Sequence, residues 1–345
     1  MIISEYVKRL KKLRMSYSHL TNFYLLDVLT LIPVPIQDIC KMKLIFKIYF
    51  MFLVSSPAYS QVDKPWFSYQ LNPTGNPIGG GRYYKAIIER RSANFIVNDK
   101  ASLLAALQNA QSGQLIYVDD TATINLSDKT NSIIPEGVTL ASGRGNQSEG
   151  ALIFSNSTFS DKEFNSMFTT GGKNVRITGL RLRGPNPDIL DHDYQLNKVA
   201  CGIRSQHTLL EVDNCELWAW DKWAIWLYVS DQSHIHHNYI HHTIRNGYGY
   251  GVWIGGSGKE QYANALIEAN LFEACRHCIA SSGHLNSWDA KYNVFMNRQL
   301  YVNVDRHGQG RGAVGGINTH LHHNLFLSRQ VHFELPYPAD SSGLV

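Results

Sequence analysis

The stretch SHIHHNYIHH, residues 233–242, holds five histidines, and it returns in outline as THLHHNLFLS at residues 319–328. Both copies contain an apolar residue, two histidines and an asparagine, followed by further apolar residues. Histidine-rich segments are typical of metal binding by composition. A metal site is rarely built twice along one chain, however, whereas a structural unit often is. The pair of segments therefore favours an internal repeat.

The repeat extends well beyond these two segments. A pattern of two alternating apolar positions, a break, a turn residue and a further apolar position recurs six times, with turn positions at residues 180, 215, 238, 270, 293 and 324. Period-2 alternation predicts strands, and units this short leave no room for helical crossovers. A second strand is predicted in the later units: WAIWLYV (223–229), YGVWIGG (250–256), HCIASSG (277–283), LYVNV (300–304) and VHFEL (331–335).

One turn and one apolar face per unit predict a solenoid of parallel strands, with coils stacked about 4.8 Å apart. Asn238, Asn270, Asn293 and Asn324 occupy the same turn position in four successive coils. Stacked side-chain amides can satisfy one another and the buried turn backbone, so we expect a single asparagine stack. The coil then sets the place of the His-His pairs 236/237 and 322/323, whose predicted role is packing.

The asparagine turn, the coil length and the glycine-containing second strands resemble the right-handed parallel β-helix proteins of the pectate lyase superfamily. The resemblance covers residues 95–335. It implies an all-β fold, a right-handed parallel β-helix solenoid with a short N-terminal capping helix. A solenoid needs cover over its open core, and residues 101–111 are the predicted cap. The fold does not choose a reaction, because it hosts lyases, hydrolases, esterases, epimerases and phage adhesins.

The two ends of the chain differ from the repeat. Residues 42–60 have a basic start, an apolar run too short to span a bilayer and a small-residue cleavage pattern, AYS. These features predict a secretory signal peptide, and hence a secreted or periplasmic protein. Residues 1–41 are then expected to be upstream sequence that is not translated. Residues 61–94 are expected to form an N-terminal arm, and residues 336–345 the irregular end of a truncated chain.

Charge and cysteine usage narrow the function classes. The first 60 residues hold eight Lys/Arg against three Asp/Glu, whereas the remaining 285 hold 24 against 25. The basic surplus therefore belongs to the front end, and no basic patch indicates nucleic acid. We expect a monomer without a membrane span that has a polysaccharide as its partner. The four cysteines beyond the signal peptide are interpreted as small core residues: Cys201, Cys215, Cys275 and Cys278.

Functional sites on a solenoid lie where polar side chains of neighbouring coils meet. The densest polar segments are RHCIASSGH (276–284) and NVDRHGQGRG (303–312), in adjacent coils. We expect a loop to bring the second segment back over the first, and a carboxylate there to raise the pKa of an imidazole. The predicted catalytic residues are Arg276, His277, Asp305, His307 and Tyr250. The predicted substrate-binding residues are Arg245, Tyr248, Trp253, Trp226, Arg306 and His284.

These residue types favour a polysaccharide lyase acting on a uronic-acid-containing glycan. Such a β-elimination needs a base, an acid for the leaving oxygen and a cation that stabilises the substrate carboxylate. Arg276 or Arg306 would supply the cation, and His277, His307 or Tyr250 would carry the proton.

Two other functions stay open at this point. A glycoside hydrolase needs two carboxylates, for which Asp305 has Asp289, Glu268 or Glu334 as partner candidates. A non-catalytic glycan-binding surface protein would need only the Trp and Tyr side chains. No cofactor is required and no metal ligand is assigned. A calcium ion stays an option, as does a metal ion held by His277, Asp305 and His307.

Overall fold

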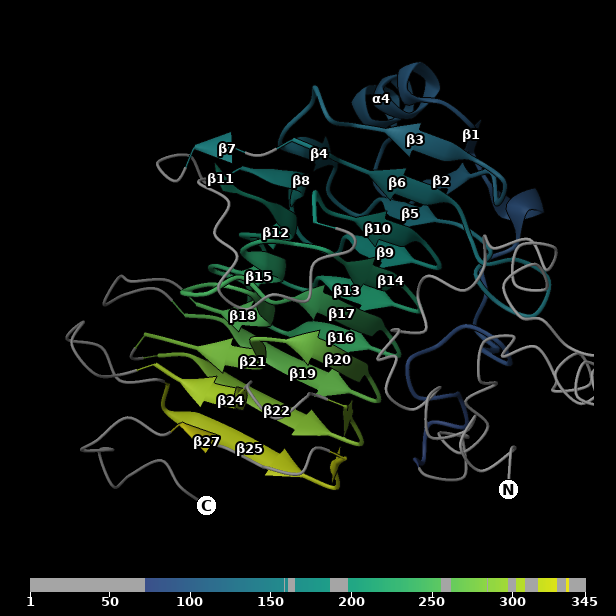
Figure 1. The fold of residues 1–345 in the computed structure, drawn as a ribbon. Coiled ribbons are helices and arrows are strands. Elements are labelled where there is room, and N and C mark those ends of the chain that lie inside the picture. The colour runs from purple at the N-terminus through teal and green to yellow at the C-terminus, as the bar shows by residue number, and fades with distance from the viewer. Residues whose placement is uncertain are drawn as a thin grey trace, which may run out of the picture. The chain divides into compact units, whose positions relative to one another are not determined.

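Three parallel sheets wind around one core, and successive coils add strands to each of them (Figure 1). The computed structural model describes residues 72–157, 159–160, 165–186, 198–255, 262–283, 285–296, 302–307, 316–327 and 333–334. All of them lie within one unit, Pro65–Val345. The arrangement confirms the predicted all-β fold, a solenoid of parallel strands.

The strands of each sheet follow one another at the coil period. Sheet 1 consists of β1 (Phe95–Val97), β2 (Leu115–Val118), β5 (Thr139–Ala141), β9 (Arg176–Thr178), β13 (Glu211–Asp213), β16 (Ser233–His236), β19 (Asn264–Glu268), β22 (Ser287–Lys291) and β25 (Asn318–His322). Sheet 2 consists of β3 (Thr123–Asn125), β6 (Leu152–Phe154), β10 (Arg181–Arg183), β14 (Glu216–Trp218), β17 (Tyr239–Thr243), β20 (Leu271–Cys275), β23 (Val294–Phe295) and β26 (Leu325–Phe326). Sheet 3 consists of β4 (Ser132–Ile134), β8 (Ser166–Thr170), β12 (Cys201–Ser205), β15 (Trp223–Leu227), β18 (Tyr250–Ile254), β21 (His277–Ser281), β24 (Val302–Arg306) and β27 (Phe333–Glu334). A separate antiparallel pair joins β7 (Phe159–Ser160) to β11 (Lys198–Val199).

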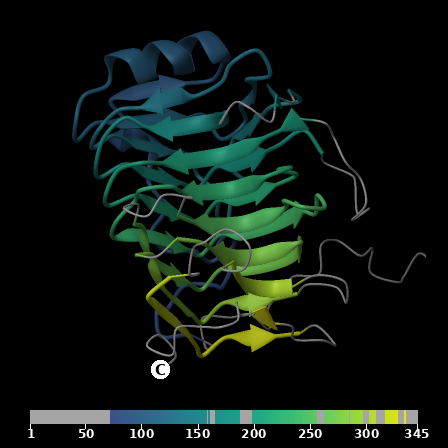
Figure 2. The ribbon, with the colours of Figure 1, turned by 90° about the vertical axis from the view of Figure 1, so that its left-hand side faces the viewer.

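The predicted cap is the helix α4 (Lys100–Asn109), which lies over the first coils (Figures 1 and 2). Asp99 starts the helix, because its side chain accepts a hydrogen bond from the backbone N–H of Ser102 at 2.8 Å. Leu103, Ala106 and Leu107 are buried on the face that contacts β1, β2 and β4. The helix thereby shields the apolar cross-section at this end of the solenoid.

The corner between sheets 1 and 2 carries the predicted asparagine stack. The side-chain oxygen of Asn270 accepts the backbone N–H of Asn238 at 3.0 Å. In the next coil, the side-chain oxygen of Asn293 accepts the backbone N–H of Asn270 at 2.9 Å. In the coil after that, the side-chain oxygen of Asn324 accepts the backbone N–H of Asn293 at 2.9 Å. Each amide nitrogen also donates to a carbonyl in the coil before it, as from Asn270 to Ile235 at 2.8 Å. The stack therefore joins four coils through side-chain hydrogen bonds, as predicted, and those of Asn238 and Asn270 are buried.

The residue before each stacked position takes a left-handed backbone conformation. Its φ is between 53° and 66° in six coils, at Gly179, Asn214, His237, Ala269, Tyr292 and His323. A side chain in this region costs roughly 1–2 kcal/mol relative to the right-handed form, and the corner bonds hold it there. His237 and His323 occupy this same corner position in their two coils. The coil sets their place, as predicted.

The described part of the N-terminal arm, residues 72–94, packs along this same corner and includes η4 (Arg90–Ser92). The backbone N–H of Gly79 donates to the carbonyl of Ala269 at 2.9 Å, and that of Gly81 to the side-chain oxygen of Asn214 at 2.7 Å. Ile78 packs against Ala269 and Leu271. The arm is thus an integral part of the fold, bound to coils far from it in sequence.

Several predictions concern segments outside the described residues. These are the upstream extension (1–41), the signal peptide (42–60) and the truncated end (336–345). The four described cysteines are buried and free. Cys215, Cys275 and Cys278 pack in the core, as predicted, whereas Cys201 packs with Trp223 and Trp226 on the other side of sheet 3. Within the described residues, no helix is long and apolar enough to cross a membrane.

Candidate functional site

The outer surface of sheet 3 is built from two rows of residues in register across the coils. The first row reads Cys201, Trp223, Tyr250, His277 and Val302, and the second reads Arg204, Trp226, Trp253, Ala280 and Asp305. Between these rows, Ile279 and Val304 point into the core. In β21 the two residues between the rows, Cys278 and Ile279, both pack in the core. Strict alternation is therefore interrupted there, and both rows face the outer surface, where their side chains pack together.

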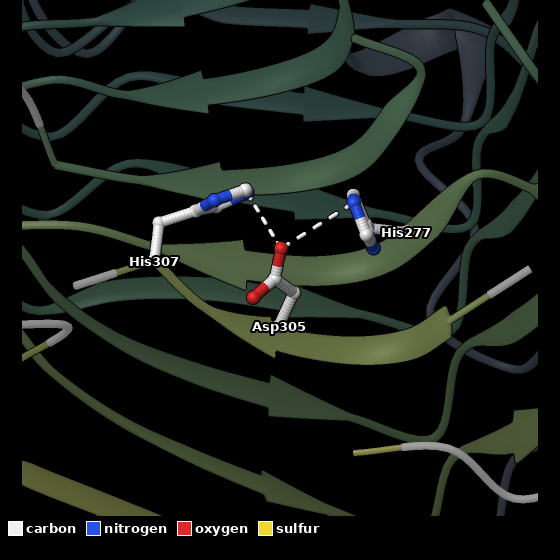
Figure 3. Close-up of side chains that lie close together, drawn as sticks. All are labelled: His277, Asp305 and His307. Atoms are coloured by element: carbon white, nitrogen blue, oxygen red, sulfur yellow. Dashed lines mark ion pairs between the residues drawn. The ribbon is translucent and has the colours of Figure 1, made fainter. Parts of the chain in front are cut away.

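His277, Asp305 and His307 converge on that surface, and we call them the His-Asp-His cluster. The Asp305 Oδ2 lies 2.6 Å from His307 Nε2 and 3.3 Å from His277 Nε2. Figure 3 shows both imidazoles directed at this one carboxylate oxygen. Side-chain exposure is 2% for His277 and 1% for Asp305, but 28% for His307. His307 is therefore the member of the cluster that solvent reaches.

The cluster forms without the loop that the sequence predicted. The second strand of this coil is β24, Val302–Arg306, two residues later than predicted, and it places Asp305 inside the strand. Asp305 pairs in register with Ala280 of β21, three residues beyond His277. The backbone N–H of His307 donates to the carbonyl of Ser281 at 2.8 Å, so it follows the strand directly. Strand pairing alone brings the groups together.

Aromatic rings fix the orientation of both imidazoles. The ring of Tyr250 stacks on His277, with centroids 5.1 Å apart and an interplanar angle of 13°. Tyr250 meets the ring of His307 at its edge, at 5.7 Å and 82°. Trp253 contacts His307 at 5.4 Å and stacks on Tyr250 at 5.0 Å. The structure thereby brings four of the five predicted catalytic residues into one group, with Trp253 beside them.

The fifth residue, Arg276, approaches from the corner before β21. Its Nη1 donates to the Tyr250 hydroxyl at 3.5 Å and to the backbone carbonyl of Tyr248 at 3.3 Å. Burial and the charge of Arg276 lower the pKa of His277 to about 3, although Asp305 acts in the opposite direction. Asp305 thus acts in the predicted direction, but the expected net rise of this pKa is wrong, because desolvation outweighs the carboxylate. His277 is neutral near pH 7.

Cations and aromatic rings continue along the same surface of sheet 3. The Lys222 ammonium lies 4.3 Å from the Trp223 ring centre and 4.6 Å from that of Tyr248. The Arg245 guanidinium lies 5.0 Å from the Tyr248 ring, and that of Arg204 lies 4.7 Å from the Trp226 ring. Such pairs hold the cations in place at an attractive distance.

The predicted substrate-binding residues differ in their exposure. Trp226 and Trp253 are only 3% and 7% exposed, so their faces are covered by neighbouring groups. Arg245 and Arg306 are also buried, and Arg306 donates to the backbone carbonyl of Gly316 at 2.6 Å. Tyr248 is partly exposed. His284 lies outside the described residues.

Asp221 and Lys222 belong to this surface but were not predicted. Burial raises the pKa of Asp221 to about 7, while the charge of Arg245 acts against the rise. Asp221 also accepts a hydrogen bond from the side chain of Asn186. The signal in the sequence is the charged pair inside the aromatic segment WAWDKWAIW, residues 218–226, where a purely structural strand would carry apolar residues.

Asp305 does not form the carboxylate pair of a hydrolase with Asp289 or with Glu268. Both residues lie on sheet 1, in β22 and β19, whereas Asp305 lies on sheet 3. Asp289 pairs with His322 at 3.0 Å, and Glu268 with His234 at 3.3 Å. Glu334 pairs in backbone register with Asp305, but its side chain lies outside the described part of the structure.

A second group of polar residues lies on sheet 1, where Asp213 is fully buried. Its carboxylate accepts hydrogen bonds from the Arg176 guanidinium at 2.9 Å, from Thr178 at 2.9 Å and from the Tyr84 hydroxyl at 2.8 Å. His236 Nε2 lies 3.2 Å from the Glu211 carboxylate. These satisfied contacts link the arm to the coils and support the packing role predicted for the opening histidines.

The buried His237 on this corner, whose Nε2 lies 2.8 Å from Thr74 Oγ1 of the arm, makes the fold sensitive to acid. Burial and His236 lower the pKa of His237 from 6.5 to about 3. Between these values the unfolded chain binds a proton that the folded chain does not, so stability falls as the pH drops from about 6.5 towards 3. We expect the melting temperature to fall less between pH 7 and pH 4 in His237→Asn than in the wild type. Asparagine tolerates the left-handed backbone at this position.

His323→Asn is the matched control, because His323 has the same place in its turn and is exposed. This variant should keep the pH dependence of the wild type. Melting curves at closely spaced pH values test the prediction, and equal slopes for wild type and His237→Asn would contradict it.

Comparison with known proteins identifies a family whose model matches more than half of the chain. Residues 114–295 match the family model described as the right handed beta helix region. An alginate lyase from Paenibacillus sp. str. FPU-7 is 15% identical with a TM-score of 0.48, over 73% of this chain and 99% of that one. ORF18 of Geobacillus virus E2 is 15% identical with a TM-score of 0.29, over 66% and 44% respectively. No protein with a curated description matches significantly.

Proposed function

The chain belongs to the right-handed β-helix family, and on that premise we propose that it is an enzyme that cleaves a uronic-acid-containing polysaccharide by β-elimination. The observation that carries the proposal is the placing of cations beside proton-carrying groups on one surface. Arg276 borders Tyr250 and the His-Asp-His cluster, and Arg245 and Lys222 lie beside Tyr248.

The reaction needs these two kinds of group together. A base removes the proton next to the uronate carboxylate, a carbon–carbon double bond forms, and the bond to the leaving oxygen breaks as that oxygen gains a proton. Negative charge builds up on the carboxylate in the transition state, and a guanidinium stabilises it best by a bidentate contact. Arg276 supplies that cation, while Tyr250, His277 and His307 are the groups able to carry protons.

The proposed substrate indicates where the protein acts in or outside the cell. Polysaccharides of this kind lie outside the cytoplasm, which agrees with the signal peptide expected over residues 42–60. Mass spectrometry of the protein recovered from the medium or periplasm should give a mature chain that begins near Gln61. A chain that retains residues 42–60 would contradict export by this route.

A panel of acidic and neutral polysaccharides tests the proposed reaction directly. New reducing ends together with the ultraviolet absorbance of an unsaturated sugar are expected, and only with acidic polymers. Reducing ends without that absorbance would indicate hydrolysis, and neither signal with any acidic polymer would contradict the proposal.

Arg276→Ala should lower kcat/KM on the acidic substrate by about 10²-fold, because one charge-assisted contact in the transition state is worth roughly 2–4 kcal/mol. Arg276→Lys should restore part of that loss, since it returns the charge without the planar fork. Arg91→Ala, at an exposed arginine in η4, is the control and should match the wild type. Equal activity of Arg276→Ala and Arg91→Ala would exclude Arg276 from the reaction.

A further inference from the structure

The His-Asp-His cluster has three atoms that hydrogen bonding within the described residues leaves unsatisfied. His277 Nε2, Asp305 Oδ2 and His307 Nε2 are each buried, and none makes a hydrogen bond of acceptable geometry there; the same is true of His277 Nδ1. The short separations of 2.6 and 3.3 Å are therefore close approaches of ligand-type atoms without the alignment of a hydrogen bond. Leaving a carboxylate and two imidazoles buried in this way is costly.

From these atoms we propose that His277 Nε2, Asp305 Oδ2 and His307 Nε2 bind one divalent transition-metal ion. All three lie within 4.8 Å of one another. Metal–ligand bonds of about 2.0–2.2 Å in a tetrahedral arrangement place the ligand atoms about 3.3–3.6 Å apart. The separation between His277 and Asp305 is already within this range. The 2.6 Å between Asp305 Oδ2 and His307 Nε2 is shorter than this spacing, so these two atoms must move apart when the ion binds.

The donor set selects the class of metal. Two imidazoles and one carboxylate are ligands of Zn²⁺, Co²⁺, Mn²⁺ or Fe²⁺, whereas Ca²⁺ and Mg²⁺ prefer oxygen ligands alone. Three protein ligands also leave a fourth position open, as in catalytic zinc sites. The calcium option raised by the sequence is therefore not the one that this cluster fits.

The contrast with the group on sheet 1 supports the assignment. Glu211, Asp213 and His236 also lie close enough together to hold an ion. There, however, both oxygens of Asp213 are hydrogen-bonded, to Arg176 and to Thr178 and Tyr84. A metal ion would have to displace those donors, including a guanidinium. The His-Asp-His cluster needs no such displacement.

The packing around the cluster holds the imidazoles in the required orientation. Tyr250 stacks on His277 and meets the edge of His307, and Trp253 contacts His307 from another side. Rings fixed in this way pre-organise a metal site. When both imidazoles bind the ion, Tyr250 is the proton carrier that remains for the proposed reaction. The metal ion then acts as a Lewis acid beside Arg276.

Zinc titration by calorimetry of the full chain, produced without a histidine tag and freed of metal by a chelator, tests the site. We expect one Zn²⁺ per chain and no heat from Ca²⁺. His307→Ala should lower the affinity at least about 100-fold, since the loss of even an outer-shell partner costs 10- to 100-fold. His236→Ala and His322→Ala, on sheet 1, are controls that should bind like the wild type.

The variant His307→Cys identifies the ligand by spectroscopy. With Co²⁺ it should show a thiolate-to-metal charge-transfer band that is missing from the wild type, whose four described cysteines are buried. Circular dichroism of the metal-free variants separates ligand loss from unfolding. Failure of folded wild-type protein to bind Zn²⁺, or unchanged binding in folded His307→Ala, would overturn the proposal. Because binding is measured without substrate, this result is independent of the polysaccharide assay.

Discussion

His277→Ala and Asp305→Asn should each lower the rate of polysaccharide cleavage by about 10²-fold or more, the scale expected when a proton-carrying or charge-stabilising group is lost. Both residues are buried in the His-Asp-His cluster, only 3.3 Å apart. Each substitution removes one of three groups that converge on the same point, so the effect on kcat should exceed the effect on KM. Steady-state kinetics on the acidic polymer identified by the panel is the measurement.

His236→Ala is the matched control, because His236 is also a buried histidine that contacts a carboxylate. It lies on sheet 1, and its activity should stay near that of the wild type. The opposite pattern, with activity kept in His277→Ala and lost in His236→Ala, would move the reaction centre to sheet 1. The histidines of the repeat would then be chemical rather than structural.

Most of the coil architecture could be predicted from the sequence. Each coil repeats the same two constraints, a period-2 apolar strand and a turn asparagine, so one pattern is read several times. The residue that takes the left-handed backbone before each asparagine gave no such signal. It is Ala269 in one coil and Tyr292 in the next, because the bonds of the corner, not the local preference, impose the conformation.

The site could be predicted only in part. Polar residues in adjacent coils identified His277, Asp305 and His307 as neighbours, since stacking follows from the repeat. The position of β24 was set two residues too early, and a loop was invoked that is not needed. The direction of the His277 pKa shift was missed because it depends on burial, which the sequence does not give.

The aromatic surface was misjudged for a related reason. Trp226 and Trp253 were predicted to bind substrate, but they are buried among Trp223, Tyr250 and Ala280. A residue that points away from the core of a solenoid is not thereby exposed, because neighbouring side chains can cover it. Lys222, in contrast, was overlooked, although it brings a charge to this same surface.

Asn270→Leu should destabilise the fold by about 3 kcal/mol or more, which is larger than the 1–3 kcal/mol expected for one buried group left without a partner. Asn270 is fully buried and leucine has nearly its shape, so the change mainly deletes hydrogen bonds. Three groups lose their partners: the backbone N–H of Asn238, a side-chain N–H of Asn238 and the carbonyl of Ile235. Water cannot replace these bonds inside the corner.

Asn324→Leu separates hydrogen bonding from burial. Asn324 accepts the backbone and side-chain N–H groups of Asn293 at 2.9 and 3.0 Å and donates to Ala290, the same set of bonds. It is only partly buried, so solvent can satisfy some of the groups that the substitution leaves behind. We expect its cost to be less than half of that at Asn270. Urea unfolding of both variants, with equal m-values, measures the difference, and equal costs would show that the stack does not depend on exclusion of water.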